Sequence, residues 1–276
     1  MILINGQPED RIDVRDRGLQ YGDGIFETIA FRDQTLQLLD AHLDRLQRGS
    51  QRLQLGLNAV DIALIRSELQ HITAGLESNA VIKVVITRGA GGRGYQYAAD
   101  FSANRIISSH PAPEYPVSYQ QDVTVRLCQQ RLAINPQLAG IKHLNRLEQV
   151  MARNEWRDPA IAEGLMLDTD GSLIEGTMSN IMMFRDGALL TPALDNCGIE
   201  GVMRGVLLDL AKQQGWQIQQ CQLTLDDLLQ ADECLLCNSV IGIWPIRQID
   251  AMDRQWPHGP MTQKLQHLLA QAIMHR

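Results

Sequence analysis

The sequence predicts an α/β protein of two domains, an α+β domain followed by a larger α/β domain. Short β-branched runs, such as AVIKVVITRG at 80–89, alternate with segments in which Leu and Ile recur at helical spacing. The 276 residues are enough for two cores. Residues 111–120 hold three prolines, which fix φ and donate no backbone hydrogen bond, and this stretch is typical of a linker.

The elements of the first half are separated by polar turns. Strands are expected at 1–5, 25–31, 80–89 and 105–110, and helices at 36–54 and 59–74. We therefore place the smaller domain at 1–113, the linker at 114–120 and the larger domain at 121–276.

The second half opens with a strand at 122–128 and a loop that leads to Lys142. A helix is expected from His143 onward, because Leu144, Leu147, Val150 and Met151 recur at helical spacing. Asp-Gly turns at 170–171 and 186–187 predict two hairpins. Further expected elements are a helix at 202–215, an apolar strand region at 234–246 and a closing amphipathic helix at 261–274.

The composition excludes several classes of function. A net charge of −7 argues against a nucleic-acid surface, although a local basic pocket for a small anion remains compatible with it. No apolar run approaches the roughly 20 residues that span a bilayer, and the N-terminus lacks the pattern of a signal peptide. The five scattered cysteines suit a reduced, cytoplasmic protein. Cys234 and Cys237 form a single C-x-x-C pair inside an apolar run, which indicates buried strand residues rather than a metal site.

Lys142 is the first candidate for chemistry. The chain has only four lysines against 21 arginines. Lys142 is expected at a helix N-terminus, whose partial positive charge lowers the pKa of an amine and so favours a Schiff-base lysine. Lys212 lies in the last turn of a helix and Lys264 on a helix face, so Lys83, within a strand, is the only rival by position. The alternative is an exposed lysine beside a helix.

Two glycine-rich segments are candidate anion sites. In GIEGVMR, at 198–204, the backbone N–H groups of Ile199 and Glu200 precede a helix and suit a phosphate. GAGGRG, at 89–94, is interpreted as a loop near a site, with Arg93 able to meet a carboxylate.

Two further segments carry charged candidates. Glu175 lies between apolar or small neighbours in SLIEGTMSN and either partners a ring nitrogen or ends a turn in solvent. His42 and Arg45 share one helix face in HLDRL, and Arg45 binds a phosphate only if that face lines a pocket.

Taken together, these segments resemble the fold-type IV pyridoxal 5′-phosphate (PLP) enzymes. This group contains D-amino-acid transaminases, branched-chain aminotransferases and aminodeoxychorismate lyases, and the segment NPQLAGIKHLNRLEQV (135–150) is most similar to the lyases. The motifs that carry the resemblance are RGLQYGDGIFET (17–28), HLDRL (42–46), the lysine segment, LIEGTMSN (173–180), GIEGVMR (198–204) and CNSVIGIWPI (237–246).

The resemblance implies a pseudo-barrel in the larger domain and a role for each candidate. Lys142 would form the imine with PLP and act as the base, and Glu175 would face the pyridine nitrogen. Arg45 would bind the phosphate with the N–H groups of Ile199 and Glu200 and with Asn238 and Ser239. Many relatives have threonine where this chain has Glu200, so a backbone contact is expected there. Arg93, Tyr95 and Tyr21 are the candidates on the substrate side.

The resemblance also implies the reaction. A lyase of this kind converts 4-amino-4-deoxychorismate to 4-aminobenzoate and pyruvate in folate synthesis and needs no amino acceptor. The first alternative is a fold-type IV aminotransferase, which shares the cofactor residues, and the second is a binding module for an anion. Relatives are usually homodimers. No metal is expected.

Overall fold

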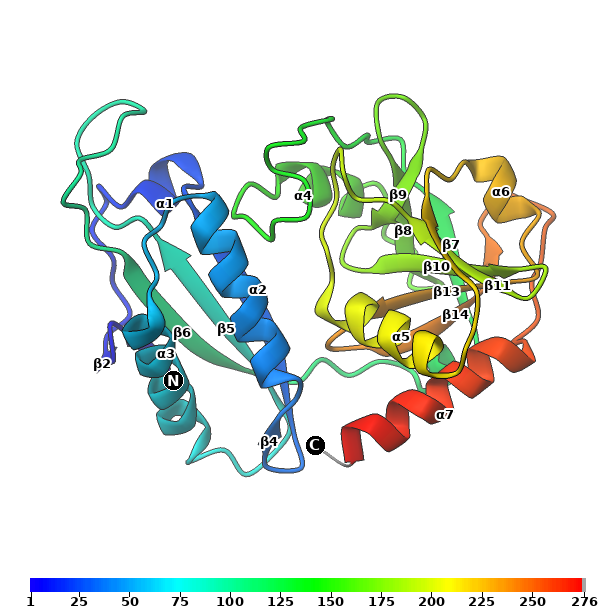
Figure 1. The fold of residues 1–276 in the computed structure, drawn as a ribbon, viewed down its shortest axis with the longest axis horizontal. Coiled ribbons are helices and arrows are strands. Elements are labelled where there is room, and N and C mark those ends of the chain that lie inside the picture. The colour runs from blue at the N-terminus through cyan, green and yellow to red at the C-terminus, as the bar shows by residue number, and fades with distance from the viewer. Residues whose placement is uncertain (275–276) are drawn as a thin grey trace. The chain divides into compact units, whose positions relative to one another are not determined.

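A computed structural model describes residues 1–274 of the chain as two compact units (Figure 1). The first unit is Met1–Glu114 together with Lys142–Asn145, and the second is Tyr115–Ile141 together with the residues from Arg146 onward. The division between Glu114 and Tyr115 falls at the expected linker, whereas Lys142 clusters with the first unit and not with the larger domain assigned from the sequence. Within residues 1–274, no helix is long and apolar enough to cross a membrane.

The first unit is built on a six-stranded antiparallel sheet. The strand order is β2-β1-β6-β5-β3-β4. The elements are β1 (Ile2–Ile4), β2 (Gln7–Pro8), α1 (Arg17–Tyr21), β3 (Gly24–Arg32), β4 (Thr35–Leu36), α2 (Leu39–Arg52), α3 (Ala59–Thr73), β5 (Ala80–Thr87) and β6 (Asn104–Pro111). All four strands and both helices that the sequence predicted in this half are confirmed.

Helices α2 and α3 cover one face of this sheet. Alternate residues of β3 are buried, because successive side chains of a strand point to opposite faces. Glu27 on that buried face bonds residues of α2, and Arg105, on the same face of β6, bonds Glu68 of α3. The other face of β3 carries Phe26, which is only partly buried.

The second unit contains a mixed eight-stranded sheet that closes on itself. The strand order is β12-β11-β10-β13-β14-β7-β8-β9, and β9 also pairs with β10, so six of the strands form a ring. This closure agrees with the pseudo-barrel that the resemblance implied. The elements are a 3-10 turn (Val117–Gln120), β7 (Val123–Leu127), α4 (Leu147–Arg153), β8 (Ile161–Leu167), β9 (Leu173–Gly176), β10 (Asn180–Arg185), β11 (Ala188–Pro192), α5 (Val202–Gln213), β12 (Ile218–Cys221), α6 (Leu225–Leu229), β13 (Glu233–Asn238), β14 (Gly242–Ile249) and α7 (Pro260–Met274).

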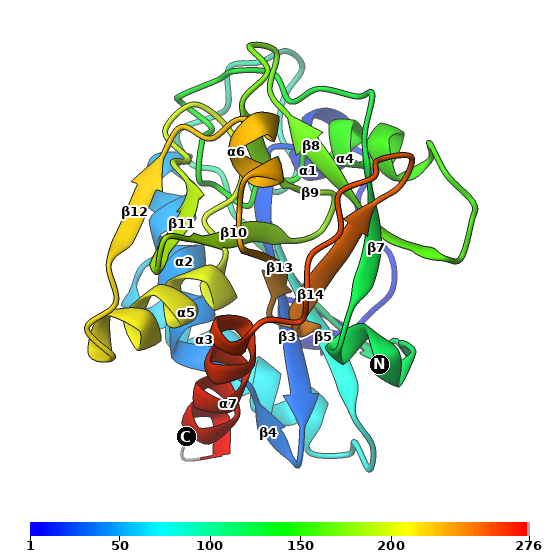
Figure 2. The same ribbon diagram turned by 90° about the vertical axis from the view of Figure 1, so that its right-hand side faces the viewer.

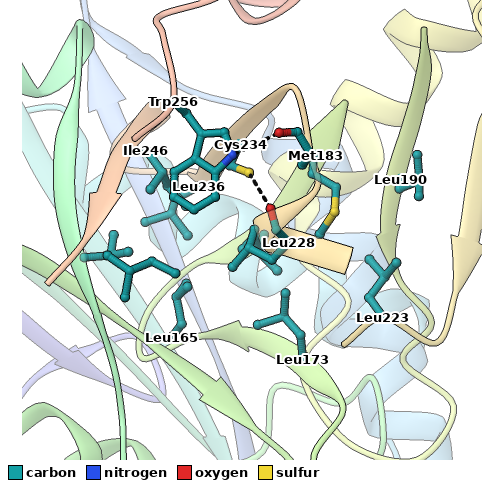
Figure 3. Close-up of a cluster of buried hydrophobic side chains, with 14 of the residues drawn as sticks. Leu165, Leu173, Met183, Leu190, Leu223, Leu228, Cys234, Leu236, Ile246 and Trp256 are labelled. Atoms are coloured by element: carbon teal, nitrogen blue, oxygen red, sulfur yellow. Dashed lines mark hydrogen bonds between the residues drawn. The ribbon is translucent and has the colours of Figure 1, made fainter. Parts of the chain in front are cut away.

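The ring of strands encloses the largest apolar core of this unit. Figure 3 shows Leu165, Met183, Leu236 and Trp256 converging from different elements. Helices α5 and α7 pack against each other beside β13 (Figure 2). The two cysteines of the C-x-x-C pair lie on β13 with at most 1% exposure, and burial raises the pKa of Cys237 to about 12. Their interpretation as buried strand residues is confirmed.

The helix expected from His143 starts later than predicted. Helix α4 begins at Leu147, because residues before it adopt an extended path: the N–H of Phe26 donates to the carbonyl of Lys142, and the N–H of Leu144 donates to the carbonyl of Gly24. The helix-dipole argument for Lys142 is therefore wrong, since a helix acts only within its first turn. The apolar residues Leu147, Val150 and Met151, whose spacing predicted the helix, are exposed, with Leu147 at 75%.

Candidate functional site

Lys142 lies in a partly buried position of the first unit. Its Nζ is 4.3 Å from the ring centroid of Phe26, and its backbone carbonyl accepts the N–H of the same residue. This pairing fixes the backbone from which the side chain extends. The candidacy of Lys142 therefore depends on its motif and on this partly buried position, and not on a helix dipole.

Comparison of the four lysines, all within the described chain, separates Lys142 from the others. Lys83, Lys212 and Lys264 are exposed, and only Lys142 is partly buried. Lys83, the rival by position, lies on β5 with its Nζ 5.4 Å from the same ring of Phe26. Lys83 therefore lies near the same ring as the candidate amine, but it is exposed, as lysines on protein surfaces usually are.

Arg45 takes part in a buried ionic cluster, together with Glu27 and His42, that the sequence analysis missed. The Nε of Arg45 donates to Oε1 of Glu27 at 2.7 Å, and Nη2 donates to Oε2 at 2.5 Å. His42 Nδ1 lies 2.6 Å from the same Oε2. Burial alone would raise the pKa of Glu27, but Arg45 and His42 outweigh it and lower that pKa to about 2. Glu27 is therefore a buried anion at neutral pH.

Glu175 lies in β9 of the second unit and is 3% exposed. Its Oε2 accepts the N–H of Ile199 at 2.8 Å, and Nε2 of Gln149 approaches Oε1 at 3.4 Å. Burial lowers the pKa of Arg146, while the charges of Glu175 and Glu148 act in the opposite direction. The carboxylate of Glu175 is thus buried, oriented by a backbone donor and close enough to Arg146 to interact with it, and the alternative of a glutamate in solvent is excluded.

The turn before α5 is held by the protein itself. The N–H of Glu200 donates to the carbonyl of Gly140 at 3.2 Å, and that of Ile199 donates to Glu175. The structure therefore differs from the expectation that both N–H groups are free for a phosphate. The side-chain amide of Asn180 donates to the carbonyl of Ile199 at 2.8 Å and adds a third hydrogen bond to this turn. The predicted helix is present as α5, which begins at Val202. Its N-cap residue is Gly201, so no side chain caps the first turn.

Asn238 is the last residue of β13, and Ser239 is the first residue of the turn that leads to β14. Oδ1 of Asn238 accepts the N–H groups of Val240 and Ile241, and Nδ2 donates to the carbonyl of Met178. Ser239 is partly buried beside it. Asn180 pairs with Cys237 on the neighbouring strand and also donates to Ile199, so the structure brings the turn after β13 close to the turn before α5.

Tyr21 and Tyr95 are brought together in the first unit, with ring centroids 5.7 Å apart. Arg17 joins them, because its guanidinium stacks over Tyr21 at 4.8 Å and donates to the carbonyls of Gly94 and Tyr95. Arg93 lies in the same loop and is exposed. The loop is thus anchored by a buried arginine that the sequence analysis did not single out.

The sequence carried a signal for one of the residues it missed. Glu27 alternates with Ile25, Ile29 and Phe31 in the predicted strand, so it was bound to lie on the apolar face. A carboxylate at such a position must have a partner. Arg146 and Asn180 had no comparable signal, because their partners are brought close only by the tertiary fold.

The chain belongs to the class IV aminotransferase family, whose description "Amino-transferase class IV" matches residues 24–249. Enzymes of this family depend on PLP.

Within that family, the chain is similar to two aminodeoxychorismate lyases along its whole length. The crystal structure of 4-amino-4-deoxychorismate lyase from Pseudomonas aeruginosa is 46% identical, covers 98% of each chain and superposes with a TM-score of 0.93. Aminodeoxychorismate lyase of Vibrio harveyi is 35% identical over 96% of this chain and 98% of its own length. D-alanine aminotransferase of Bacillus licheniformis is 25% identical over 99% of this chain and 97% of its own.

Proposed function

We propose that this chain is an aminodeoxychorismate lyase that converts 4-amino-4-deoxychorismate to 4-aminobenzoate and pyruvate in folate synthesis. The observation that carries this proposal is the full-length similarity to the Pseudomonas aeruginosa lyase at 46% identity, against 25% for a D-alanine aminotransferase. The segment around Lys142, NPQLAGIKHLNRLEQV, supports the same choice within the family.

The residues present fit PLP in chemical type. The cofactor needs an amine for its aldehyde, an acid for its ring nitrogen and cationic or neutral donors for its phosphate. The chain offers a partly buried Lys142, a carboxylate of Glu175 that is 3% exposed and a guanidinium of Arg45 that is 8% exposed. The carboxylate of Glu175 is buried and oriented by the N–H of Ile199, and a carboxylate in such a setting suits a protonated ring nitrogen, because an opposite charge nearby favours its ionised form.

When bound, PLP supplies an aldehyde for covalent attachment and a ring that accepts the electron pair of a broken C–H bond. Glu175 holds a proton on the pyridine nitrogen, and the N–H of Ile199 keeps the carboxylate of Glu175 oriented for this task. Lys142 holds the cofactor at rest. The released Nζ of Lys142 then takes the proton from the substrate carbon that bears the amine. The C–O bond between the substrate ring and the enolpyruvyl group breaks, the released enolpyruvate takes up a proton to become pyruvate, and aromatisation of the ring drives the reaction.

The phosphate contacts that we propose are fewer than the sequence suggested. Arg45 supplies the charged contact, and the turn of Asn238 and Ser239 supplies neutral donors. The turn of Ile199 and Glu200 contributes through its position before α5, because its two N–H groups donate to Glu175 and Gly140. Glu200 is exposed, which is compatible with a side chain turned away from an anion.

The substrate side is proposed to involve Arg93, Tyr21 and Tyr95. Arg93 supplies a guanidinium suited to a carboxylate, and Tyr95, two residues after it in the sequence, is in ring contact with Tyr21. The proposed substrate is a small dicarboxylate, so a cationic residue in this loop can attract it although the net charge of the chain is −7.

We also propose that the protein acts as a cytoplasmic homodimer. The exposed apolar side chains of α4, Leu147, Val150 and Met151, are 52–75% exposed in a single chain, which is an arrangement typical of a surface that another subunit covers. The five cysteines are unpaired, in agreement with a reducing compartment. Sedimentation of the purified protein measures the first point, and a mass of one chain, 30.9 kDa, would contradict it.

The decisive test of the function is a product assay with 4-amino-4-deoxychorismate and no added keto acid. We expect 4-aminobenzoate and pyruvate in equal amounts. Transfer of the amino group from a D- or branched-chain amino acid to a keto acid, without formation of 4-aminobenzoate, would show an aminotransferase instead. The Lys142→Ala variant is the control and should abolish product formation.

A further inference from the structure

Glu27 occupies a position where a carboxylate is unexpected. It is 1% exposed on the helix-covered face of β3, between Ile25 and Ile29, which are at most 2% exposed. A buried charge is tolerated only when partners compensate for the water it has lost. Neither the family assignment nor the reaction given above assigns a role to this residue.

Both partners of Glu27 come from one face of α2. Arg45 makes a two-point contact through Nε and Nη2, and His42, three residues earlier and so on the same helix face, contacts the carboxylate through Nδ1. A two-point contact between a guanidinium and a carboxylate fixes the plane of the guanidinium as well as its position. The direction of the third nitrogen, Nη1, is fixed as a consequence.

His42 is fully buried, and its environment makes it a donor to Glu27. Burial lowers its pKa, Glu27 acts in the opposite direction, and the charges of Arg45 and Lys142 lower it further. A neutral imidazole has one N–H, and the 2.6 Å contact with the carboxylate places that N–H on Nδ1. Nε2 has no hydrogen-bond partner within residues 1–274. The imidazole therefore contributes a single directed hydrogen bond, and that bond goes to Glu27.

We propose that Glu27 and His42 are positioning residues that orient the guanidinium of Arg45 toward the phosphate of the cofactor. The proposal rests on the proposed function, because it takes Arg45 as the phosphate ligand. An arginine side chain has many rotamers, and a ligand that must order it loses affinity. Glu27 fixes the guanidinium before the cofactor arrives, and His42 holds Glu27 in the orientation that does so.

The same unit contains a matched pair without this role. Arg105 makes a two-point contact with Glu68, through Nε at 3.1 Å and Nη2 at 2.8 Å, and Glu68 is 8% exposed. That pair joins β6 to α3 and involves no candidate site residue. Glu68→Gln therefore reproduces the loss of a buried ionic pair and controls for a purely structural effect of Glu27→Gln.

The experiment compares the affinity of the cofactor-free enzyme for PLP with its affinity for pyridoxal, which lacks the phosphate. The dissociation constant of pyridoxal divided by that of PLP isolates the phosphate contribution, and this ratio does not depend on turnover. Glu27→Gln should lower this ratio by about tenfold, the scale of one charge-assisted hydrogen bond, with pyridoxal affinity unchanged. Glu68→Gln should leave the ratio unchanged within about twofold while lowering thermal stability.

His42 variants provide a second arm that does not alter the carboxylate. His42→Phe removes the donor and should lower the ratio, and His42→Asn, whose amide N–H lies near the position of Nδ1, should restore it. A folded Glu27→Gln protein with the wild-type ratio would overturn the proposal, and so would equal ratios in His42→Phe and His42→Asn.

The failure of the proposed function gives a different result. In that case, wild-type protein binds no PLP, or it binds PLP and pyridoxal equally and the Arg45→Lys variant does the same. If Arg45→Lys lowers the ratio but Glu27→Gln and His42→Phe do not, the function stands and only the positioning role is lost.

Discussion

Replacement of Glu27 by glutamine should make the protein less stable at neutral pH and its stability less dependent on acid. The pKa of Glu27 lies at about 2 in the folded protein, below its ordinary value of 4.5, because Arg45 and His42 outweigh the effect of burial. A carboxyl group with a lowered pKa stabilises the folded state above its unfolded-state pKa. That stabilisation is lost as the pH falls through 4.5 toward about 2.

The size of the effect follows from the same two pKa values. The difference between 4.5 and about 2 corresponds to about 3 kcal/mol of folding free energy at neutral pH, at about 1.4 kcal/mol for each pH unit. At about pH 3, both the folded and the unfolded state bind part of the proton, and the contribution falls by about 2 kcal/mol. Glutamine does not titrate, so the difference in unfolding free energy between wild type and Glu27→Gln should be about 2 kcal/mol smaller at about pH 3 than at about pH 7.

Urea unfolding followed by far-ultraviolet circular dichroism measures this difference at about pH 7 and about pH 3. The control is Leu69→Ala in α3, a fully buried side chain of the same unit, which should cost about 2–5 kcal/mol at both pH values because it removes no titratable group. A penalty for Glu27→Gln that is equal at the two pH values would refute the reasoning about the buried anion.

Two further predictions concern the turn before α5 and the loop that contains Arg93. A side chain at Gly201 would place its Cβ 2.0 Å from Oδ1 of Asn180, so Gly201→Ala should break the hydrogen bond between Asn180 and Ile199 and weaken PLP binding by about tenfold. The control is Gly205→Ala in α5, whose Cβ would meet nothing within 4 Å and which should leave PLP affinity unchanged. Equal PLP affinities of the two variants would contradict this account. Arg17→Leu removes the donors to the carbonyls of Gly94 and Tyr95, so trypsin should cleave after Arg93 about tenfold faster, and an unchanged cleavage rate would mean that the loop is held by other contacts.

The fold was largely predictable because its signals are local. Apolar runs and alternation identify the strands of both units, and Asp-Gly turns identify two hairpins of the second unit, where the turn at Asp186 has the positive φ of 51° that such a turn requires. The start of α4 was not predictable from periodicity. Residues 142–144 follow the same spacing as the helix, but they pair with Gly24 and Phe26, more than a hundred positions earlier in the chain. Tertiary pairing outweighed local spacing there.

The candidate site shows the same limit. Lys142, Glu175 and Arg45 were identified from motif and residue type, and the structure gives each a buried or partly buried setting. The physical reason given for Lys142, a helix dipole, did not hold. The partners that orient these groups, Glu27 for Arg45 and the N–H of Ile199 for Glu175, lie far from them in the sequence. Only Glu27 could have been inferred, because it interrupts an apolar strand face.

The most direct test is to reduce the PLP-loaded protein with borohydride, digest it and locate the added mass by mass spectrometry. The account predicts one labelled peptide, with the pyridoxyl group on Lys142, and no label in the Lys142→Ala protein. A label on Lys83 or another lysine, or no label on a protein that still forms 4-aminobenzoate, would contradict it.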